Sequence, residues 1–438
     1  MVAEAFSLTR YIDRASSAEC LPVVGRVVRT VGLLIESNGP RARVGDLCEL
    51  QGAPGEAPLT VEVVGFREGR LLSVPLGGTS GIRAGDRIVG RGSTATVPVG
   101  ETLLGRVIDG LGRPIDSLGP LDAALEYPLH PPPINPLARD PIVAPIGTGV
   151  RAVDAMLTCG RGQRLGLFGG SGVGKSTLLG MMARGTTADI AVIALVGERG
   201  REVRGFLEHD LGTEGLRRAV VVVSTSDNPP LLRMRAAYAA TAISEYFRDQ
   251  GRNVLLMMDS LTRFAMAQRE VGLAAGEPPT AKGYPPSVFA LLPMLLERAG
   301  NLRGRGSITA LYSVLVEGDD STEPIADSVR AILDGHVVLA RDLAARNHYP
   351  AIDILQSVSR TMPDVTGVDH RMKAGRLRDW MATIKENEDL ISVGAYVPGS
   401  NPRVDEAFAK REAIDGFLRQ PADALASIDE GIAGLMAL

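Results

Sequence analysis

The chain has 438 residues, which is longer than a single hydrophobic core usually supports, so two or three domains are expected. Its formal net charge is −4 and no block of Lys or Arg stands out, which argues against a surface that tracks nucleic acid. The three cysteines (Cys20, Cys48, Cys159) lack metal-ligand spacing, and no signal peptide or bilayer-spanning apolar run is apparent, so we expect a soluble protein of the reducing cytoplasm.

The N-terminal part of the chain is predicted to be a short segment followed by a β-barrel. Residues 1–20 are weakly amphipathic, and both a frayed terminus and a docking helix remain open for them. Residues 21–97 contain short β-branched runs separated by Gly, Pro and Asn, which is the spacing of a small barrel. These runs lie at 23–31, 60–66, 71–76 and 87–89.

Residues 98–365 are expected to form the largest domain. After a proline-rich connector, helical stretches alternate with apolar runs that end in a polar residue, a pattern typical of a mainly parallel sheet covered by helices. Two such runs lead to Glu198 and Asp259, and ligands bind beyond the carboxyl ends of parallel strands. Residues 366–438 are helix-rich and charged, and they are predicted to form a small helical domain with helices at 371–386, 405–418 and 422–435.

The clearest motif is a complete P-loop, Gly-Gly-Ser-Gly-Val-Gly-Lys-Ser, at residues 169–176. An apolar run enters it and a helix-forming run leaves it, which is the strand–loop–helix context that the motif requires. Glycines permit positive φ and turn N–H groups onto phosphate oxygens, Lys175 adds a mobile positive charge, and Ser176 offers a hydroxyl to Mg²⁺. The sequence therefore predicts a nucleoside triphosphatase whose phosphate cradle comprises Gly169, Gly170, Ser171, Gly172, Val173, Gly174, Lys175, Ser176 and Thr177.

Phosphoryl transfer also needs a carboxylate near Mg²⁺, a group that orients water and a cation for the transition state. Asp259 is the candidate for the Mg²⁺ carboxylate, and the alternative is an Asp that only caps the following helix. Glu198 is the candidate that polarises the attacking water, with Arg199 beside it as a cation. Without the P-loop, Glu198 would be interpreted as an ordinary charge at the end of a strand.

Several longer motifs in order resemble the ATPase of type III protein export. This family powers the flagellar export apparatus and the related virulence injectisome, and it is similar to the catalytic β subunit of rotary ATP synthases. The resemblance extends from the barrel to the C-terminal helices. It rests on residues 197–202 (Gly-Glu-Arg-Gly-Arg-Glu), 259–264 (Asp-Ser-Leu-Thr-Arg-Phe), 276–279 (Gly-Glu-Pro-Pro), 283–287 (Gly-Tyr-Pro-Pro-Ser) and 348–353 (His-Tyr-Pro-Ala-Ile-Asp).

The resemblance implies a RecA-like core and a homohexameric ring that hydrolyses ATP with Mg²⁺ at its subunit interfaces. It implies that Arg360 is an arginine finger that reaches the neighbour's γ-phosphate, and that Tyr349 stacks on adenine. Residues 276–287 resemble a loop that lines the ring pore, where a coiled-coil stalk protein is expected. The other implied partners are a stator or regulator protein, the membrane proteins of the export gate, and export substrates with their chaperones, at the cytoplasmic side of the inner membrane.

Flagellar export is preferred over the injectisome. Residues 262–270 and 330–336 look more flagellar, whereas residues 345–349 look more like the injectisome branch. Two other classes stay open. A nucleotide-binding scaffold without turnover is disfavoured by Glu198, and a hexameric RNA translocase of similar core fold is disfavoured by the acidic charge balance and by a barrel with little basic or aromatic interleaving.

Overall fold

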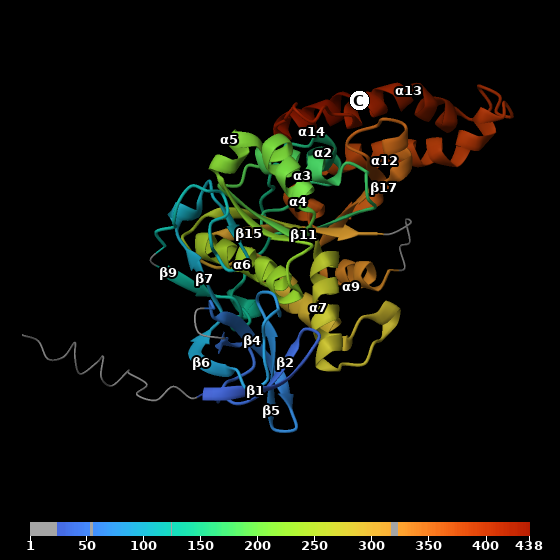
Figure 1. Cartoon of the computed structure of the whole chain (residues 1–438). Helices are drawn as coiled ribbons and strands as arrows, with labels where there is room; N and C mark the ends of the chain where they lie inside the picture. Colours follow the sequence, from blue (N-terminus) through green and yellow to red (C-terminus); the bar gives the residue numbers. More distant parts are fainter. Residues whose placement is uncertain (1–23, 53–55, 124, 317–322) are drawn as a thin grey trace, which may run out of the picture. The chain divides into compact units, whose positions relative to one another are not determined.

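The computed structural model describes residues 24–52, 56–123, 125–316 and 323–438 (Figure 1). The segment expected at residues 1–20 lies outside the described residues. The chain divides between Ala95 and Thr96 into two compact units, each with its own set of internal contacts. No helix among the described residues is long and apolar enough to cross a membrane.

The first unit contains a closed six-stranded barrel, as predicted. Its strands follow the order β1-β2-β5-β4-β3-β6 and enclose an apolar core that includes Ile35, Val61 and Ile88. The apolar runs of the sequence indicated four of the strands, and the other two contain charged residues that interrupt the pattern. The strands are β1 (Val24–Val31), β2 (Leu34–Asn38), β3 (Asp46–Gln51), β4 (Leu59–Arg67), β5 (Arg70–Pro75) and β6 (Arg87–Thr94).

The second unit is built on a mainly parallel sheet, which confirms the predicted fold class. The strand order is β17-β16-β10-β15-β13-β11-β12-β8, with β14 paired to β15, and a separate ladder joins β7 (Thr96–Val99) to β9 (Leu125–Pro128). Within the described part of the chain, the β16–β17 and β14–β15 pairs are the only antiparallel pairs of the large sheet. The strands are β8 (Val107–Asp109), β10 (Arg164–Gly169), β11 (Ile190–Glu198), β12 (Ala219–Thr225), β13 (Asn253–Asp259), β14 (Gly300–Asn301), β15 (Ser307–Leu315), β16 (Gly335–Leu339) and β17 (Ile352–Ser359).

Helices cover both faces of this sheet, because its strands are apolar on both sides. The long helix α6, nearly all of it buried, packs against β11, β12 and β13 together with α7, and the helix α3 after the P-loop lies on the other face (Figure 1). The helices are α2 (Arg151–Met156), α3 (Lys175–Gly185), α4 (Gly200–Gly205), α5 (Gly212–Arg217), α6 (Pro230–Asp249), α7 (Leu261–Ala275), α8 (Pro286–Leu296), α9 (Pro324–Ile332), α10 (Arg341–Ala345) and α11 (Met362–Val365).

Three helices end the chain: α12 (Val368–Ser392), α13 (Pro402–Leu418) and α14 (Ile428–Ala437). Trp380, Phe417 and Leu435 from these helices belong to the same apolar core as α2 and α3. The last helix begins at Ile428 rather than at 422, because Ser427 and Glu430 form a capping box there. Residues 419–426, which we call the strap, therefore form an irregular connection between α13 and α14.

Candidate active site

The P-loop joins the end of β10 to the start of α3, as predicted. Gly172 and Gly174 have φ values of 81° and 85°, in the left-handed region that glycine adopts most readily. Val173 is buried and anchors the loop, whereas Ser171, Ser176 and Thr177 are exposed. A loop held in this way presents its N–H groups and the amino end of α3 to an anion.

Lys175 and Asp259 meet at the centre of the candidate site. The Lys175 Nζ lies 3.0 Å from the Asp259 Oδ1, and both side chains are nearly buried. Ser313 on the neighbouring strand β15 donates a hydrogen bond of 2.7 Å to the same Asp259 oxygen. The lysine is thus held at the end of β13 by a carboxylate, in a position from which its flexible stem can turn to phosphate.

The same place offers oxygen ligands that suit Mg²⁺. This ion needs only one or two protein oxygens, because waters and substrate phosphates complete its octahedral shell. Asp259 supplies a carboxylate, and the exposed hydroxyl of Ser176 stands in the first turn of α3. These two oxygens suit a magnesium ion whose remaining ligands are waters and phosphate. No group of three or more His, Cys, Asp or Glu side chains with metal-binding geometry occurs in the described part of the chain.

Glu198 ends β11, the neighbour of β13, and lies half-buried close to this pair. Burial first, and then the charge of Asp259, raise the pKa of Glu198 to about 7, while Lys175 opposes the rise. Its buried Oε1 has no hydrogen-bond partner among the described residues. A carboxyl group with a pKa near neutrality and an unused oxygen can accept a proton from a bound water.

Arg263 is a residue of this cluster to which the sequence reasoning assigned no role. It lies in the first turn of α7, and its stem packs so closely on Gly197 that a Cβ there would lie 2.9 Å from the Arg263 Cβ. Its buried Nε has no hydrogen-bond partner in the described structure, and its charge lowers the pKa of Glu198. The available signal was its place in the quoted motif 259–264, directly after the strand end that carries Asp259.

Tyr349 and Arg199, two further predicted site residues, differ in what their side chains contact. The Tyr349 ring, about 40% exposed, packs on Gly174, where a Cβ would lie 3.2 Å from its Cε1. The ring thus stands beside the start of α3. Arg199 is different, because its side chain is 77% exposed and its ion pair is with Glu202 at 3.9 Å.

Arg360 lies at the end of the sheet where β10 and β16 begin, whereas the P-loop lies at the end where β10 finishes. Because β17 is antiparallel to β16, Ser359 pairs with Gly335 at the start of β16, and the Arg360 N–H donates to the Asp334 carbonyl oxygen at 2.9 Å. The P-loop follows the other end of β10, a strand of 6 residues that spans about 20 Å. The exposed Arg360 side chain is therefore not part of the cluster formed by Lys175, Glu198 and Asp259 in its own chain.

Comparison with known proteins identifies the family of the chain. Residues 149–359 match the model of the ATP synthase alpha/beta family nucleotide-binding domain, and residues 366–437 match that of the T3SS EscN ATPase C-terminal domain. The chain is 51% identical to the flagellum-specific ATP synthase of Pseudomonas aeruginosa, over 99% of this chain and 98% of that protein. It is 52% identical to the type 3 secretion system ATPase of Xanthomonas euvesicatoria, over 92% and 91% of the two chains.

This chain belongs to the type III export ATPase family. A solved relative is the assembled ATPase EscN from the type III secretion system of enteropathogenic E. coli, with a TM-score of 0.89 and 47% identity, covering 94% of this chain and 99% of EscN. EscN has also been solved in complex with its central stalk EscO. This export ATPase thus has the RecA-like fold that the sequence motifs predicted.

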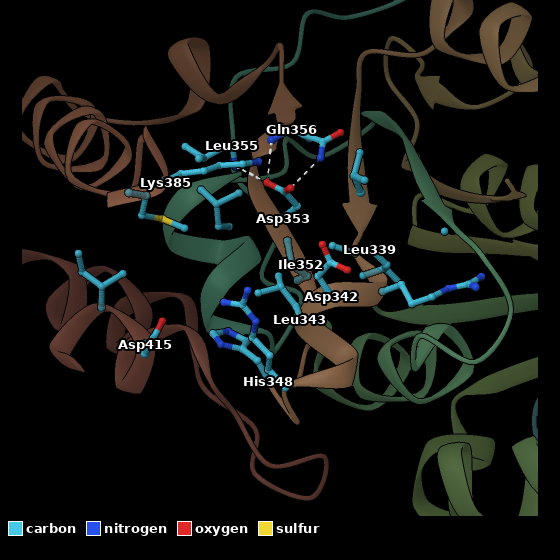
Figure 2. A pocket seen from close by; sticks show the side chains of 18 of the residues that line it. Leu339, Asp342, Leu343, His348, Ile352, Asp353, Leu355, Gln356, Lys385 and Asp415 are labelled. Carbon is cyan, nitrogen blue, oxygen red and sulfur yellow. Dashed lines mark hydrogen bonds between the residues drawn. The ribbon is translucent and has the colours of Figure 1, made fainter. Parts of the chain in front are cut away.

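This export ATPase also contains a cavity of about 530 Å³ outside the cluster just described (Figure 2). It lies between β16, β17 and α10 on one side and α12 and α13 on the other, and its lining includes Gly169 but none of Lys175, Glu198 and Asp259. Within it, Asp353 accepts hydrogen bonds from the main-chain N–H groups of Leu355 and Gln356. These bonds give partners to two main-chain N–H groups of β17 where its pairing with β16 is interrupted. β17 is an edge strand of the described sheet.

Proposed function

We propose that the chain is an Mg²⁺-dependent ATPase that works as a homohexameric ring and promotes the release, unfolding and delivery of substrates of the flagellar export apparatus. The observation that carries this proposal is the convergence of Lys175, Asp259 and Glu198 beside the P-loop, with Arg360 left exposed on the far edge of the sheet. The first three residues supply the parts of a hydrolytic site, and the fourth is available to a neighbouring copy.

Each residue of the cluster has a distinct role in the proposed reaction. The Lys175 ammonium moves from Asp259 to the β- and γ-phosphates. The Ser176 hydroxyl and, through water, the Asp259 carboxylate would hold Mg²⁺. Bound Mg²⁺ would neutralise charge on the phosphate oxygens. Glu198 orients the attacking water and takes its proton, and the charge of Arg263 opposes the rise in the pKa of this carboxyl group. Arg199, although exposed and paired with Glu202 in this structure, is proposed to supply a cation beside Glu198 at the γ-phosphate.

The site is completed by a second copy of the chain. An arginine finger acts on the charge that develops in phosphoryl transfer, and Arg360 is too far from its own P-loop to serve it. We therefore assign Arg360 to the neighbour's γ-phosphate and Tyr349 to the adenine ring, next to the phosphate cradle. We also propose that residues 276–287 line the pore of the ring and contact a coiled-coil stalk, in line with the EscN–EscO complex.

The partners and the location follow from the same proposal. We infer that the ring works in the cytoplasm, associated peripherally with the inner-membrane export gate, and binds a stator protein, chaperones and export substrates but no nucleic acid. The barrel (21–97), the ATPase domain (98–365) and the C-terminal helices (366–438) are the proposed functional divisions. Flagellar relatives and type 3 secretion relatives are about equally similar to this chain. The amino-acid sequences of residues 262–270 and 330–336 favour flagellar export.

Two experiments test the proposal at its two levels. Glu198→Gln should retain ATP affinity and lose turnover, because the amide keeps the shape of the side chain but cannot accept the proton. Turnover that survives would show that another group is the base.

Deletion of the gene should abolish or severely reduce motility and leave needle-dependent secretion unchanged. Normal swimming together with lost effector secretion would assign the ATPase to an injectisome instead.

A further inference from the structure

The strap contains a buried glutamine that makes four hydrogen bonds to main-chain groups. Gln420 is only 5% exposed. Its Oε1 accepts from the Arg151 N–H at 2.8 Å, and its Nε2 donates to the carbonyl oxygens of Gly149 at 2.8 Å and Ala424 at 2.6 Å. Its own N–H donates to the carbonyl oxygen of Tyr349 at 2.9 Å. The side chain of Gln420 therefore joins the strap to the start of α2, and its main-chain N–H joins the strap to the segment before Pro350.

These partners require an amide at position 420. One main-chain N–H and two carbonyl oxygens face the side chain, and only Asn and Gln carry an acceptor oxygen and two N–H donors on one terminal group. A glutamate of the same shape would keep the acceptor and lose both donors. An alanine would leave all three main-chain groups unpaired in a buried place, which is costly.

The strap is also fastened to both ends of α3, the helix that follows the P-loop. At the amino end, the main-chain N–H of Gln420 donates to the carbonyl oxygen of Tyr349, whose ring packs on Gly174. At the carboxyl end, Gly149 lies so close to Gly185 that a Cβ on Gly149 would lie 2.5 Å from the Gly185 Cα. There Arg184 Nη2 also donates to the Ala422 carbonyl oxygen at 2.6 Å.

We propose that Gln420 is a positioning residue for the nucleotide base. Its buried side chain anchors the strap, and the anchored main-chain N–H of Gln420 holds the Tyr349 carbonyl oxygen. The side chain thereby sets where the aromatic ring stands beside Gly174 and the amino end of α3. The inference rests on the proposed stacking of Tyr349 on adenine. The phosphate-binding lysine has a separate anchor, because Lys175 pairs with Asp259 at the end of β13 and Ser313 on β15 holds the same carboxylate. Gln420 therefore affects ligands that carry a base and spares ligands that consist of phosphate alone.

The test compares two probes by calorimetric titration of the full chain: Mg-ADP, which carries the base, and Mg-tripolyphosphate, which does not. Gln420→Ala should weaken Mg-ADP binding about tenfold, the effect of one lost buried hydrogen-bond network, and should change tripolyphosphate binding less than about twofold. In turnover, KM for ATP should rise while kcat stays within about twofold. Asp423→Ala, at an exposed strap position, is the matched control and should change neither affinity.

Gln420→Glu keeps the size of the side chain and replaces the amide nitrogen by a carboxylate oxygen that faces the carbonyl oxygens of Gly149 and Ala424, so it breaks the same two bonds if the alanine variant does not fold. Equal loss of affinity for both probes would overturn the inference, because it would indicate a general structural role. Unchanged Mg-ADP affinity in both Gln420 variants would overturn it as well.

A double-mutant comparison separates this inference from the proposed function. If Gln420 acts through the ring, Tyr349→Ala combined with Gln420→Ala should bind Mg-ADP no more weakly than Tyr349→Ala alone. Additive losses would show that Gln420 acts by another route. If Tyr349→Ala by itself leaves Mg-ADP affinity unchanged, the stacking role of Tyr349 fails, and the positioning role of Gln420 fails with it. If Tyr349→Ala weakens binding and the Gln420 variants do not, only the positioning role fails.

Discussion

The pH dependence of ATP hydrolysis should report the ionisation of Glu198. With its pKa at about 7, the carboxyl group is ionised in about 9% of molecules at pH 6 and about 91% at pH 8. Because only the ionised form can accept the proton, kcat/KM should rise about tenfold across this range. The neighbouring carboxyl of Glu202 contributes to the raised pKa. Glu202→Gln should therefore move the midpoint toward acid, because an amide donates a hydrogen bond to the ionised form.

The size of this shift follows from the energy of one such bond. A hydrogen bond to a charged group contributes about 1.5 kcal/mol and one pH unit corresponds to 1.36 kcal/mol, so the midpoint should fall by up to about one unit. At pH 6 the ionised fraction then rises from about 9% to about 50%, which predicts about fivefold faster turnover for the variant and almost no change at pH 8.

The assay is the initial rate at low Mg-ATP from pH 5.5 to 9 at constant ionic strength. Ionisation of the substrate affects both proteins equally, so the difference between their profiles isolates the enzyme. Glu208→Gln is the matched control, because Glu208 is half-exposed and pairs with Arg204 instead, and its profile should coincide with that of the unmodified protein. Coincident profiles for Glu202→Gln, or an alkaline shift, would refute the assignment of this titration to Glu198.

Three further predictions concern the cluster, the assembly and the fold. Lys175→Ala should lower turnover by more than tenfold, or about 1.4 kcal/mol of barrier, because the phosphates lose their mobile cation; a smaller loss in a rate assay would contradict the site. Arg360→Ala should leave nucleotide binding intact and reduce assembly-dependent turnover by about 10³-fold. Mixing it with Glu198→Gln subunits should restore part of the activity, and no recovery at any ratio would count against a shared site. Gly180→Ala should destabilise the protein by about 1–3 kcal/mol, because its Cβ would lie 2.6 Å from the Asp210 carbonyl oxygen, whereas Gly416→Ala, which meets nothing within 4 Å on α13, should stabilise it by about 0.5–1 kcal/mol; thermal unfolding distinguishes the two.

Several elements of the fold could not be predicted because tertiary contacts override the local pattern. The strands β2 and β3 contain Glu36, Asp46 and Glu49, which break the apolar run, yet closure of the barrel pairs both strands with their neighbours. The final helix was expected from position 422, and the structure begins it at Ile428. Residues 419–426 are not helical, because their main-chain groups bond to Tyr349, Gly149 and Arg184.

The sequence by itself determined the chemistry of the phosphate cradle. Its glycines, lysine and hydroxyls are consecutive, and the positive φ values of Gly172 and Gly174 arise within one turn of chain. Alternation of strands and helices also predicted that Glu198 and Asp259 lie at the carboxyl ends of two parallel strands, and the structure shows that these strands are neighbours. Only the tertiary structure decided that Lys175 contacts Asp259, that Arg263 packs on Gly197 and that Gln420 holds Tyr349. Those contacts join residues far apart in the chain, and their geometry depends on the register of the whole sheet and on how the C-terminal helices pack against it.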